Sequence, residues 1–257
     1  MLVNALALAL LSSMPPMPDA RALIEKSWNR THVVGHRGAA AYLPENTLDG
    51  FRKAIEVGAS ATECDVHMSK DGVAMVMHDE TLDRTTDLTG AVKDTPAKTM
   101  TDAGIPTLED FIEVCKNKIV AVIEIKKGDG VVPEVVRLVR KHKTESQTIL
   151  FSFNHDFVTE AKKLAPEITA IWLVSKRQKP EDFPAFLAKV QEAKADGVGF
   201  QFLNAYPELA TELRKKKIPL FCWTVPPGEQ INRLADLKVN FIITDHPKDV
   251  LFSLAAR

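Results

Sequence analysis

The first half of the chain carries reactive side chains in close pairs, namely His36-Arg37, Glu63 with Asp65, His78-Asp79, and Glu124 with Lys126. Residues two apart on a strand face the same side, so Glu63 and Asp65 point together while Cys64 points away. The same spacing places Glu124 and Lys126 on one face. Three converging carboxylates repel one another unless a cation lies between them. Their hard oxygen ligands predict one divalent cation, Mg²⁺ or Ca²⁺, rather than structural zinc.

The other members of this set predict phosphoryl transfer. Arg37 and Lys126 can hold phosphate oxygens. His36 and His78 can act as general base and general acid on opposite sides of phosphorus, although the residue types do not say which is which. The sequence has no Walker loop and no glycine-rich dinucleotide loop, which disfavours nucleoside triphosphates and NAD as ligands. The alternative interpretation is a set of isolated salt bridges at strand ends.

Short β-rich apolar runs alternate with amphipathic stretches along the chain. Eight runs predict strands, at 32–36, 62–67, 119–125, 148–153, 168–174, 197–202, 218–225 and 240–244. Apolar residues at three- and four-residue spacing predict helices at 48–57, 108–116, 133–141, 157–164, 184–193, 207–216 and 229–237. Eight strand–helix units favour an α/β fold, the closed (β/α)8 TIM barrel, over an open sheet.

A ninth apolar run, at 73–78, predicts a hairpin with the second strand, because Lys70-Asp71-Gly72 is a turn signal. It leads into a short insertion at 80–105. In a barrel of this type the site lies at the carboxyl ends of the strands, where the paired residues fall. Trp223 stands near the end of the seventh strand and predicts a substrate contact, with core packing as the alternative. His67 shares a face with Asp65 and is a further candidate ligand.

The composition is that of an ordinary soluble globular protein, with 257 residues, 45% hydrophobic and 26% charged. A net charge of −1 disfavours nucleic acid as a partner. No run approaches the roughly 20 apolar residues of a membrane span, so we expect no stable membrane insertion. The three cysteines are widely spaced and form no disulfide framework, so the chain does not need an oxidising compartment. These features leave the oligomeric state open.

We divide the chain into an N-terminal helical segment, 1–28, and a single barrel domain, 29–257. The apolar run 5–11 and Ala20-Arg21-Ala22 are parts of a signal-peptide pattern. Against export, the first four residues include no Lys or Arg and the apolar run is short. We expect a cytoplasmic protein in which this segment covers the base of the barrel, burying Leu6, Leu10, Leu23 and Trp28. The alternative is export through a cleaved signal peptide.

Nine short motifs follow one another along the chain: GHRG at 35–38, PENT at 44–47, ECDV at 63–66, HDETLDRTT at 78–86, PTLED at 106–110, EIK at 124–126, SF at 152–153, WTV at 223–225 and TDHP at 244–247. Together they resemble the glycerophosphodiester phosphodiesterase family. The resemblance extends over about residues 32–250, and the ordered set is far more specific than HRG alone. One departure is Pro226-Pro227 after WTV, where the family often has Asn; it alters a loop at the barrel mouth.

The resemblance implies a TIM barrel that uses a divalent cation to hydrolyse glycerophosphodiesters to an alcohol and sn-glycerol 3-phosphate. By motif, the residues it assigns are the acid–base pair His36 and His78, the metal ligands Glu63, Asp65 and Glu124, and the phosphate contacts Arg37 and Lys126. Glu45 of PENT would orient this shell, or else belong to the helix start at Asn46-Thr47. The nucleophile is either water or the glycerol hydroxyl of the substrate.

Two other functions compete with hydrolysis of a small-molecule glycerophosphodiester. A phospholipase-D-like barrel acting on intact lipid would carry an exposed apolar loop at its mouth. No such loop is evident after the strands, and the insertion shows no obvious pocket for a lipid tail. A non-catalytic phosphodiester-binding barrel would tolerate loss of a metal ligand or a histidine, whereas every motif position is filled here.

Overall fold

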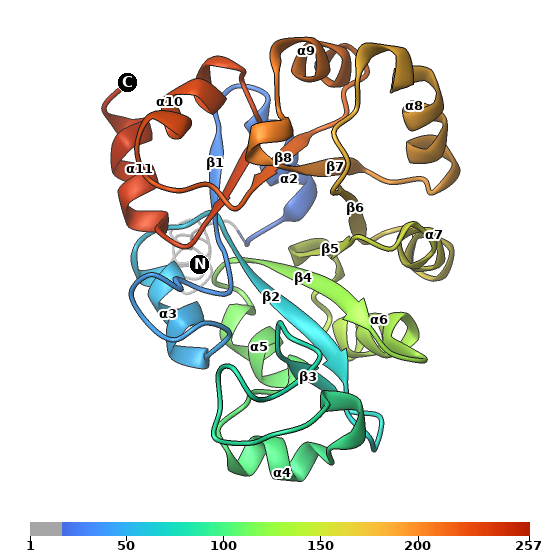
Figure 1. Cartoon of the computed structure of the whole chain (residues 1–257). Coiled ribbons are helices and arrows are strands. Elements are labelled where there is room, and N and C mark those ends of the chain that lie inside the picture. The colour runs from blue at the N-terminus through green and yellow to red at the C-terminus, as the bar shows by residue number, and fades with distance from the viewer. Residues whose placement is uncertain (1–16) are drawn as a thin grey trace, which may run out of the picture.

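The computed structural model describes residues 17–257 and contains a barrel of eight parallel strands (Figure 1). These strands are β1 (His32–Gly35), β2 (Ala61–Met68), β4 (Val120–Lys127), β5 (Thr148–Ser152), β6 (Thr169–Val174), β7 (Gly197–Gln201), β8 (Leu220–Trp223) and β9 (Phe241–Thr244). Because β1 pairs with both β9 and β2, the sheet closes on itself. The predicted (β/α)8 TIM barrel is confirmed.

Helices surround the barrel (Figure 1). They are α3 (Leu48–Glu56), α5 (Leu108–Cys115), α6 (Val131–His142), α7 (His155–Leu164), α8 (Phe183–Glu192), α9 (Pro207–Lys215), α10 (Glu229–Asp236) and α11 (Pro247–Ala255). Polar side chains begin several of them. Thr47 caps α3 through a bond from the Gly50 N–H, and Thr107 forms a capping box with Asp110 at the start of α5.

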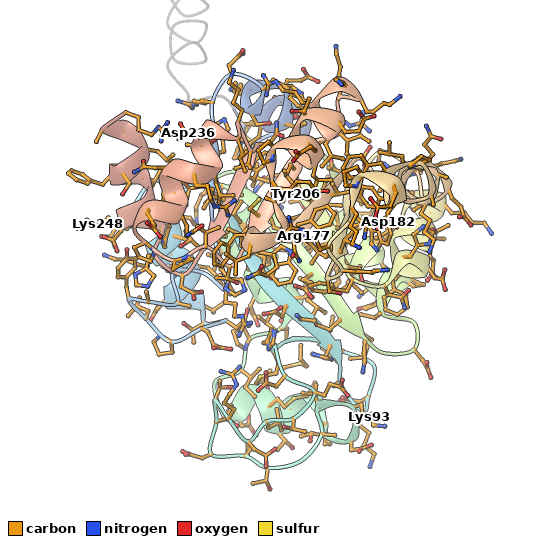
Figure 2. The ribbon with its side chains drawn as sticks, turned by 45° about the horizontal axis from the view of Figure 1, so that its top comes forward. Lys93, Arg177, Asp182, Tyr206, Asp236 and Lys248 are labelled. Carbon is orange, nitrogen blue, oxygen red and sulfur yellow. The ribbon has the colours of Figure 1, made fainter. Side chains whose placement is uncertain are left out.

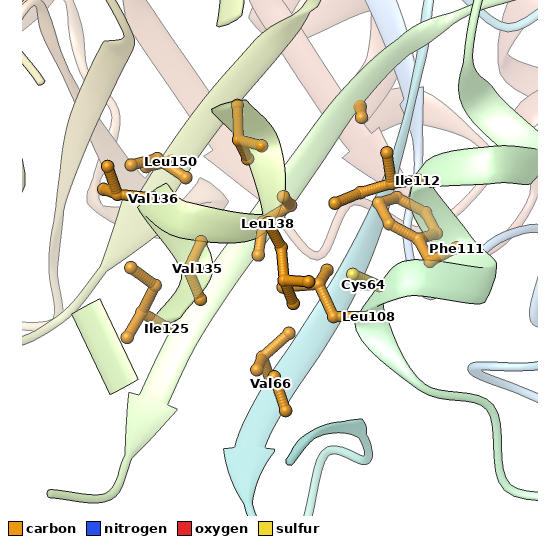
Figure 3. Close-up of a cluster of buried hydrophobic side chains, with 14 of the residues drawn as sticks. Cys64, Val66, Leu108, Phe111, Ile112, Ile125, Val135, Val136, Leu138 and Leu150 are labelled. Carbon is orange, nitrogen blue, oxygen red and sulfur yellow. The ribbon is translucent and has the colours of Figure 1, made fainter. Parts of the chain in front are cut away.

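Strand β4 shows how the sequence pattern positions the site. Ala121, Ile123 and Ile125 face outward and pack in the cluster under α5 and α6, part of which Figure 3 shows. The alternate residues Val120 and Val122 belong to the cluster inside the barrel. Since side chains alternate along a strand, the residues that follow on the inner face at the carboxyl end are Glu124 and Lys126.

The insertion after β2 has a small core of its own. It contains β3 (Ala74–Val76), a 3₁₀ turn η1 (Val92–Asp94) and α4 (Ala97–Asp102), and β3 pairs antiparallel with β2 as the turn signal predicts. Helix α4 is not among the helices that the apolar spacing predicts. The insertion core consists of Met75, Met77, Leu82, Val92, Ala97, Met100 and Ile105. In Figure 2 this part, marked by Lys93, projects beyond the ring of helices.

Helix α2 (Ala20–Ser27) lies against the amino ends of the strands. Arg21 donates to the Glu167 carbonyl at 3.0 Å just before β6, and the Asn240 amide lies 2.9 Å from Ser27 Oγ just before β9. Leu23 and Trp28, which we expect to be buried, are only half-buried, although Leu23 packs against the barrel interior. Leu6 and Leu10 lie outside the described residues. Within residues 17–257 no helix is both long and apolar enough to cross a membrane.

Candidate active site

A cavity of about 160 Å³ opens at the carboxyl ends of the barrel strands. Its polar lining consists of His36, Arg37, Glu63, His78, Glu124, Lys126 and Thr224, and its apolar wall of Phe151, Phe153, Leu173, Trp223 and Ile243. The structure thus brings together side chains from eight strands or the loops that follow them, namely β1 to β6, β8 and β9. Of the predicted site residues, Asp65, Glu45 and the further candidate His67 are not part of the lining, and all three contact residues that are.

Three carboxylates converge at the inner wall of this cavity. One oxygen each from Glu63, Asp65 and Glu124 lies within 4.8 Å of the other two, and all three side chains are buried. Cys64, between the first two, faces the outer cluster as its place on the strand predicts. The predicted convergence of these residues is therefore present in the structure.

The buried carboxylates of this triad repel one another, and their pKa values show it. Burial, together with the charges of Asp65 and Glu124, raises the pKa of Glu63 well above its ordinary value. Burial and the Asp65 charge raise the pKa of Glu124 to about 7, even though Lys126 lies 2.6 Å from its Oε1. Burial would raise the pKa of Asp65 as well, but Lys126 and Arg37 outweigh it and lower that pKa to about 2. Lys126 and Arg37 thus offset the cost of burying the negative charge of Asp65, but not that of Glu63 or Glu124.

The triad fits a divalent cation. Glu63 Oε1 is buried and has no hydrogen-bond partner among residues 17–257, although its Oε2 accepts the Arg37 N–H at 2.8 Å. A buried acceptor without a donor is costly, and a bound cation would satisfy it. Carboxylate oxygens alone make up the donor set, which suits Mg²⁺ or Ca²⁺.

Two cations stand beside the triad and face the cavity. Lys126 Nζ lies 3.0 Å from Asp65 Oδ1, and Arg37 Nε lies 3.4 Å from the other oxygen of the same carboxylate. Burial would lower the pKa of Lys126, but the charges of Asp65 and Glu124 raise it, so the ammonium stays protonated. Both positive groups are therefore available to phosphate oxygens in the cavity.

Both predicted catalytic histidines line the cavity and both have a carboxylate on Nδ1. His36 Nδ1 lies 2.7 Å from Asp245 Oδ1, and His78 Nδ1 lies 2.7 Å from Asp79 Oδ1. A carboxylate accepts the Nδ1 proton, so in the neutral ring Nε2 carries the lone pair. Sequence reasoning missed the roles of Asp245 and Asp79, although TDHP and HD stand among the motifs.

The loop between β1 and α3 fixes the position of His36 and Arg37. Gly38 has a φ of +93°, and a Cβ there would lie 2.6 Å from the Gly50 carbonyl carbon, so only glycine allows this approach to α3. Further along, Asn46 donates to Asp65 Oδ2 at 2.8 Å. Glu45 accepts from Arg37 Nη1 at 2.9 Å. The structure thus places Asn46 on the triad and Glu45 on the guanidinium.

Two further sequence expectations concern residues around the cavity. The His67 imidazole lies 3.1 Å from the His78 carbonyl oxygen. It is not part of the cluster of possible metal ligands, which consists of Glu63, Asp65 and Glu124. Trp223 lines the cavity with its ring edge-on to Phe153, at 5.2 Å between centroids. Its buried Nε1 has no acceptor within the described part of the chain. An oxygen of a bound molecule would satisfy that donor.

A cavity of about 210 Å³ adjoins the catalytic cavity and shares His78, Glu124, Lys126 and Phe153 with it. Two larger cavities lie elsewhere. One of about 620 Å³ lies at the opposite end of the barrel beside α2. Another of about 360 Å³ lies between the insertion and the PENT loop. Ile105 and Pro106 are among its lining residues, and a sequence pattern does not reveal such a space. It shares no lining residue with the catalytic cavity.

Comparison with known proteins agrees with this site. A model of the glycerophosphoryl diester phosphodiesterase family matches residues 36–249, which include every residue of the cavity. The glycerophosphodiester phosphodiesterase of Caldanaerobacter subterraneus is 35% identical over 240 residues, covering 86% of this chain and 97% of that protein. A Bacillus subtilis glycerophosphodiester phosphodiesterase is 29% identical over 273 residues, covering 94% and 93%.

Solved structures share the fold. The Thermotoga maritima glycerophosphodiester phosphodiesterase has a TM-score of 0.73 at 29% identity, over 88% of this chain and 98% of that one. An Oleispira antarctica phosphodiesterase, solved with its product sn-glycerol-3-phosphate, has a TM-score of 0.82 at 24% identity, over 89% and 99%. The family match covers most of the chain, and the reactive residues of its motifs meet in one cavity. The chain therefore belongs to the glycerophosphoryl diester phosphodiesterase family and is a phosphoric diester hydrolase.

Proposed function

We propose that this enzyme hydrolyses soluble glycerophosphodiesters to an alcohol and sn-glycerol 3-phosphate, with His36 and His78 as the acid–base pair and with one divalent cation. The observation that carries the proposal is the cavity itself, in which two carboxylate-bound imidazoles, two cations and a carboxylate triad surround one space. A glycerol phosphate group is small enough for a space of about 160 Å³.

In this proposal Arg37 and Lys126 bind the non-bridging phosphate oxygens and orient the phosphorus between the two imidazoles. One imidazole Nε2 takes the proton of the attacking oxygen as the new P–O bond forms. The other, protonated on Nε2, gives its proton to the alcohol oxygen as the old P–O bond breaks. Asp245 and Asp79 hold the two rings and stabilise whichever one is positively charged.

The triad of Glu63, Asp65 and Glu124 would hold the cation. When bound, Mg²⁺ or Ca²⁺ would neutralise the negative charge that builds up on the phosphate oxygens. The apolar wall excludes water from one side of the space, and the Trp223 indole N–H can donate to an oxygen of the glycerol arm. The proposed substrate stays a small molecule. The catalytic cavity is small, and the cavity between the insertion and the PENT loop shares no lining residue with it, so it does not extend the space for a lipid tail.

The decisive experiment measures release of sn-glycerol 3-phosphate from several glycerophosphodiesters, before and after exhaustive chelation. We expect turnover that EDTA abolishes and that Mg²⁺, Ca²⁺ or Mn²⁺ restores. Full activity after chelation would overturn the metal assignment. Diester binding with no turnover under any metal would favour the non-catalytic barrel.

A matched assay separates the lipid-active alternative. Cosedimentation with phospholipid vesicles and release of headgroup from intact phospholipid test the phospholipase-D-like function directly. We expect neither, while the deacylated diester of the same headgroup is hydrolysed.

A further inference from the structure

Arg84, in the insertion, joins two carboxylates that belong to different loops. Its Nε lies 2.6 Å from Asp79 Oδ2, and its Nη2 lies 3.1 Å from Asp79 Oδ1. On the other edge, its Nη1 lies 3.0 Å from Glu45 Oε2, and Nη2 lies 2.7 Å from Glu45 Oε1. One guanidinium therefore makes a two-point contact with each carboxylate.

Each of these carboxylates has a second partner that lines the catalytic cavity. Asp79 Oδ1 accepts from His78 Nδ1 at 2.7 Å, and Glu45 Oε1 accepts from Arg37 Nη1 at 2.9 Å. An unbroken series of hydrogen bonds thus runs from the imidazole through Asp79, Arg84 and Glu45 to the phosphate-facing guanidinium.

The geometry of arginine makes this connection stiff. A guanidinium is planar and presents its N–H groups in a fixed fork, so two carboxylates bound to its two edges are held at a set separation and angle. A lysine ammonium offers the same charge without the fork. Arg84 is 48% exposed, which limits what its forked ion pairs contribute to global stability. A melting temperature measured beside the kinetics separates an effect on the positions of the cavity groups from an effect on folding.

We propose that Arg84 is a positioning residue of the phosphodiester reaction, which fixes the His78 imidazole and the Arg37 guanidinium relative to each other. The insertion then forms part of the active centre, although none of its residues beyond His78 lines the catalytic cavity. The inference rests on the proposed function, since both of the groups it positions act on the phosphate there.

The test compares Arg84→Ala and Arg84→Lys with the wild-type enzyme under saturating metal. The matched control is Lys98→Ala, which removes an exposed ion pair to Asp102 within the same insertion and away from the cavity. Displacement of a catalytic group by about 1 Å can cost about 10²-fold in rate. We therefore expect kcat to fall at least about tenfold in both Arg84 variants, with a smaller change in KM. Both should keep the melting temperature of the control.

Three results would overturn the proposal: kcat of Arg84→Ala within twofold of wild type, full activity of Arg84→Lys, or a loss that appears only in KM. An inactive wild-type enzyme would instead refute the proposed function, so the two failures are distinguishable.

A mutant cycle tests whether Arg84 influences kcat through Asp79 and Glu45. In a background with Asp79→Asn and Glu45→Gln, both carboxylates that Arg84 contacts are already neutral. Adding Arg84→Ala to this background should lower kcat less than twofold further. A further tenfold loss would show that Arg84 acts by another route and would overturn the proposal.

Discussion

The two imidazoles of the cavity share one arrangement of partners but receive them from different parts of the chain. His78 takes its carboxylate from the next residue, whereas His36 takes it from Asp245, at the far end of the barrel domain. Burial would raise the pKa of Asp245, but the hydrogen bond and the charge of His36 outweigh burial and lower that pKa. That carboxylate therefore stays ionised and keeps accepting the Nδ1 proton.

We expect His36→Ala and His78→Ala each to lower kcat by at least about 10²-fold on natural diesters, the usual scale of general acid–base catalysis. A nitrophenyl ester has a leaving group that needs little protonation. On that substrate the variant that lacks the acid should lose much less than the variant that lacks the base. Steady-state kinetics of both variants on both substrates identify the acid. A wild-type rate in either variant would remove that histidine from the mechanism.

Glu63→Gln keeps the shape of the side chain and removes the charge that a cation needs. We expect metal affinity to fall by at least about tenfold, as when a charged oxygen ligand is lost. Because the variant relieves repulsion within the triad, the metal-free protein should be at least as stable as wild type. Calorimetric titration of Mg²⁺ and a thermal melt without metal measure the two effects. Unchanged metal affinity would contradict the ligand assignment.

The residues that sequence reasoning finds and those it misses differ in kind. Glu63, Asp65 and Glu124 are predictable because two-residue spacing on strands sets a common face. Asn46 contacts Asp65 and Asp245 contacts His36, each at a distance in sequence that neither periodicity nor residue type can predict. Arg84 is missed for the same reason, since an arginine in a polar insertion is usually a solvated surface charge.

At the scale of elements, strand and helix positions are more predictable than the irregular parts. The alternation along β4 is readable because Ala121, Ile123 and Ile125 occupy every second place. The register of β2 against β4 shifts between Val66 and His67, and this irregularity sits where His67 turns toward the His78 carbonyl. A uniform two-residue period cannot predict such a shift.

Strand β1 carries a titratable group that couples its stability to pH. His32 is 4% exposed, and burial lowers its pKa from 6.5 to about 4. The unfolded chain takes up a proton near pH 6.5 that the folded chain resists until about pH 4. The associated stability is therefore complete above pH 6.5 and is lost as the pH falls toward 4, by up to about 3 kcal/mol.

His32→Asn removes this titration while it keeps a polar atom near Ser60, which lies 2.9 Å from His32 Nδ1. Urea unfolding at pH 7, 5.5 and 4.5 measures the free energy of unfolding of both proteins. We expect the wild type to lose more stability than the variant on acidification, since all other titrating groups are common to both. Parallel losses would contradict the assignment.

At the scale of the whole molecule, α2 bears on the fate of the N-terminal segment. Cleavage after Ala22 would cut inside this helix and remove its cap Asp19 and the buried Ala20. We propose that the segment is retained and that the enzyme works in the cytoplasm. Mass spectrometry of the protein from its own host should find a peptide that spans Ala22 and Leu23 uncut. A mature N-terminus at Leu23 would show export instead.

The pairing of β1 with β9 also governs when activity can arise during synthesis. The first and last barrel strands meet in register from His32 with Phe241 to Gly35 with Thr244, and the bond from His36 to Asp245 lies just beyond this seam. A ribosome must therefore release the last strand before the first imidazole acquires its carboxylate. A chain without β9 leaves the facing edges of β1 and β8 unpaired, and unpaired strand edges favour aggregation. Closure of the barrel and completion of the His36–Asp245 pair therefore occur in the same late step of folding.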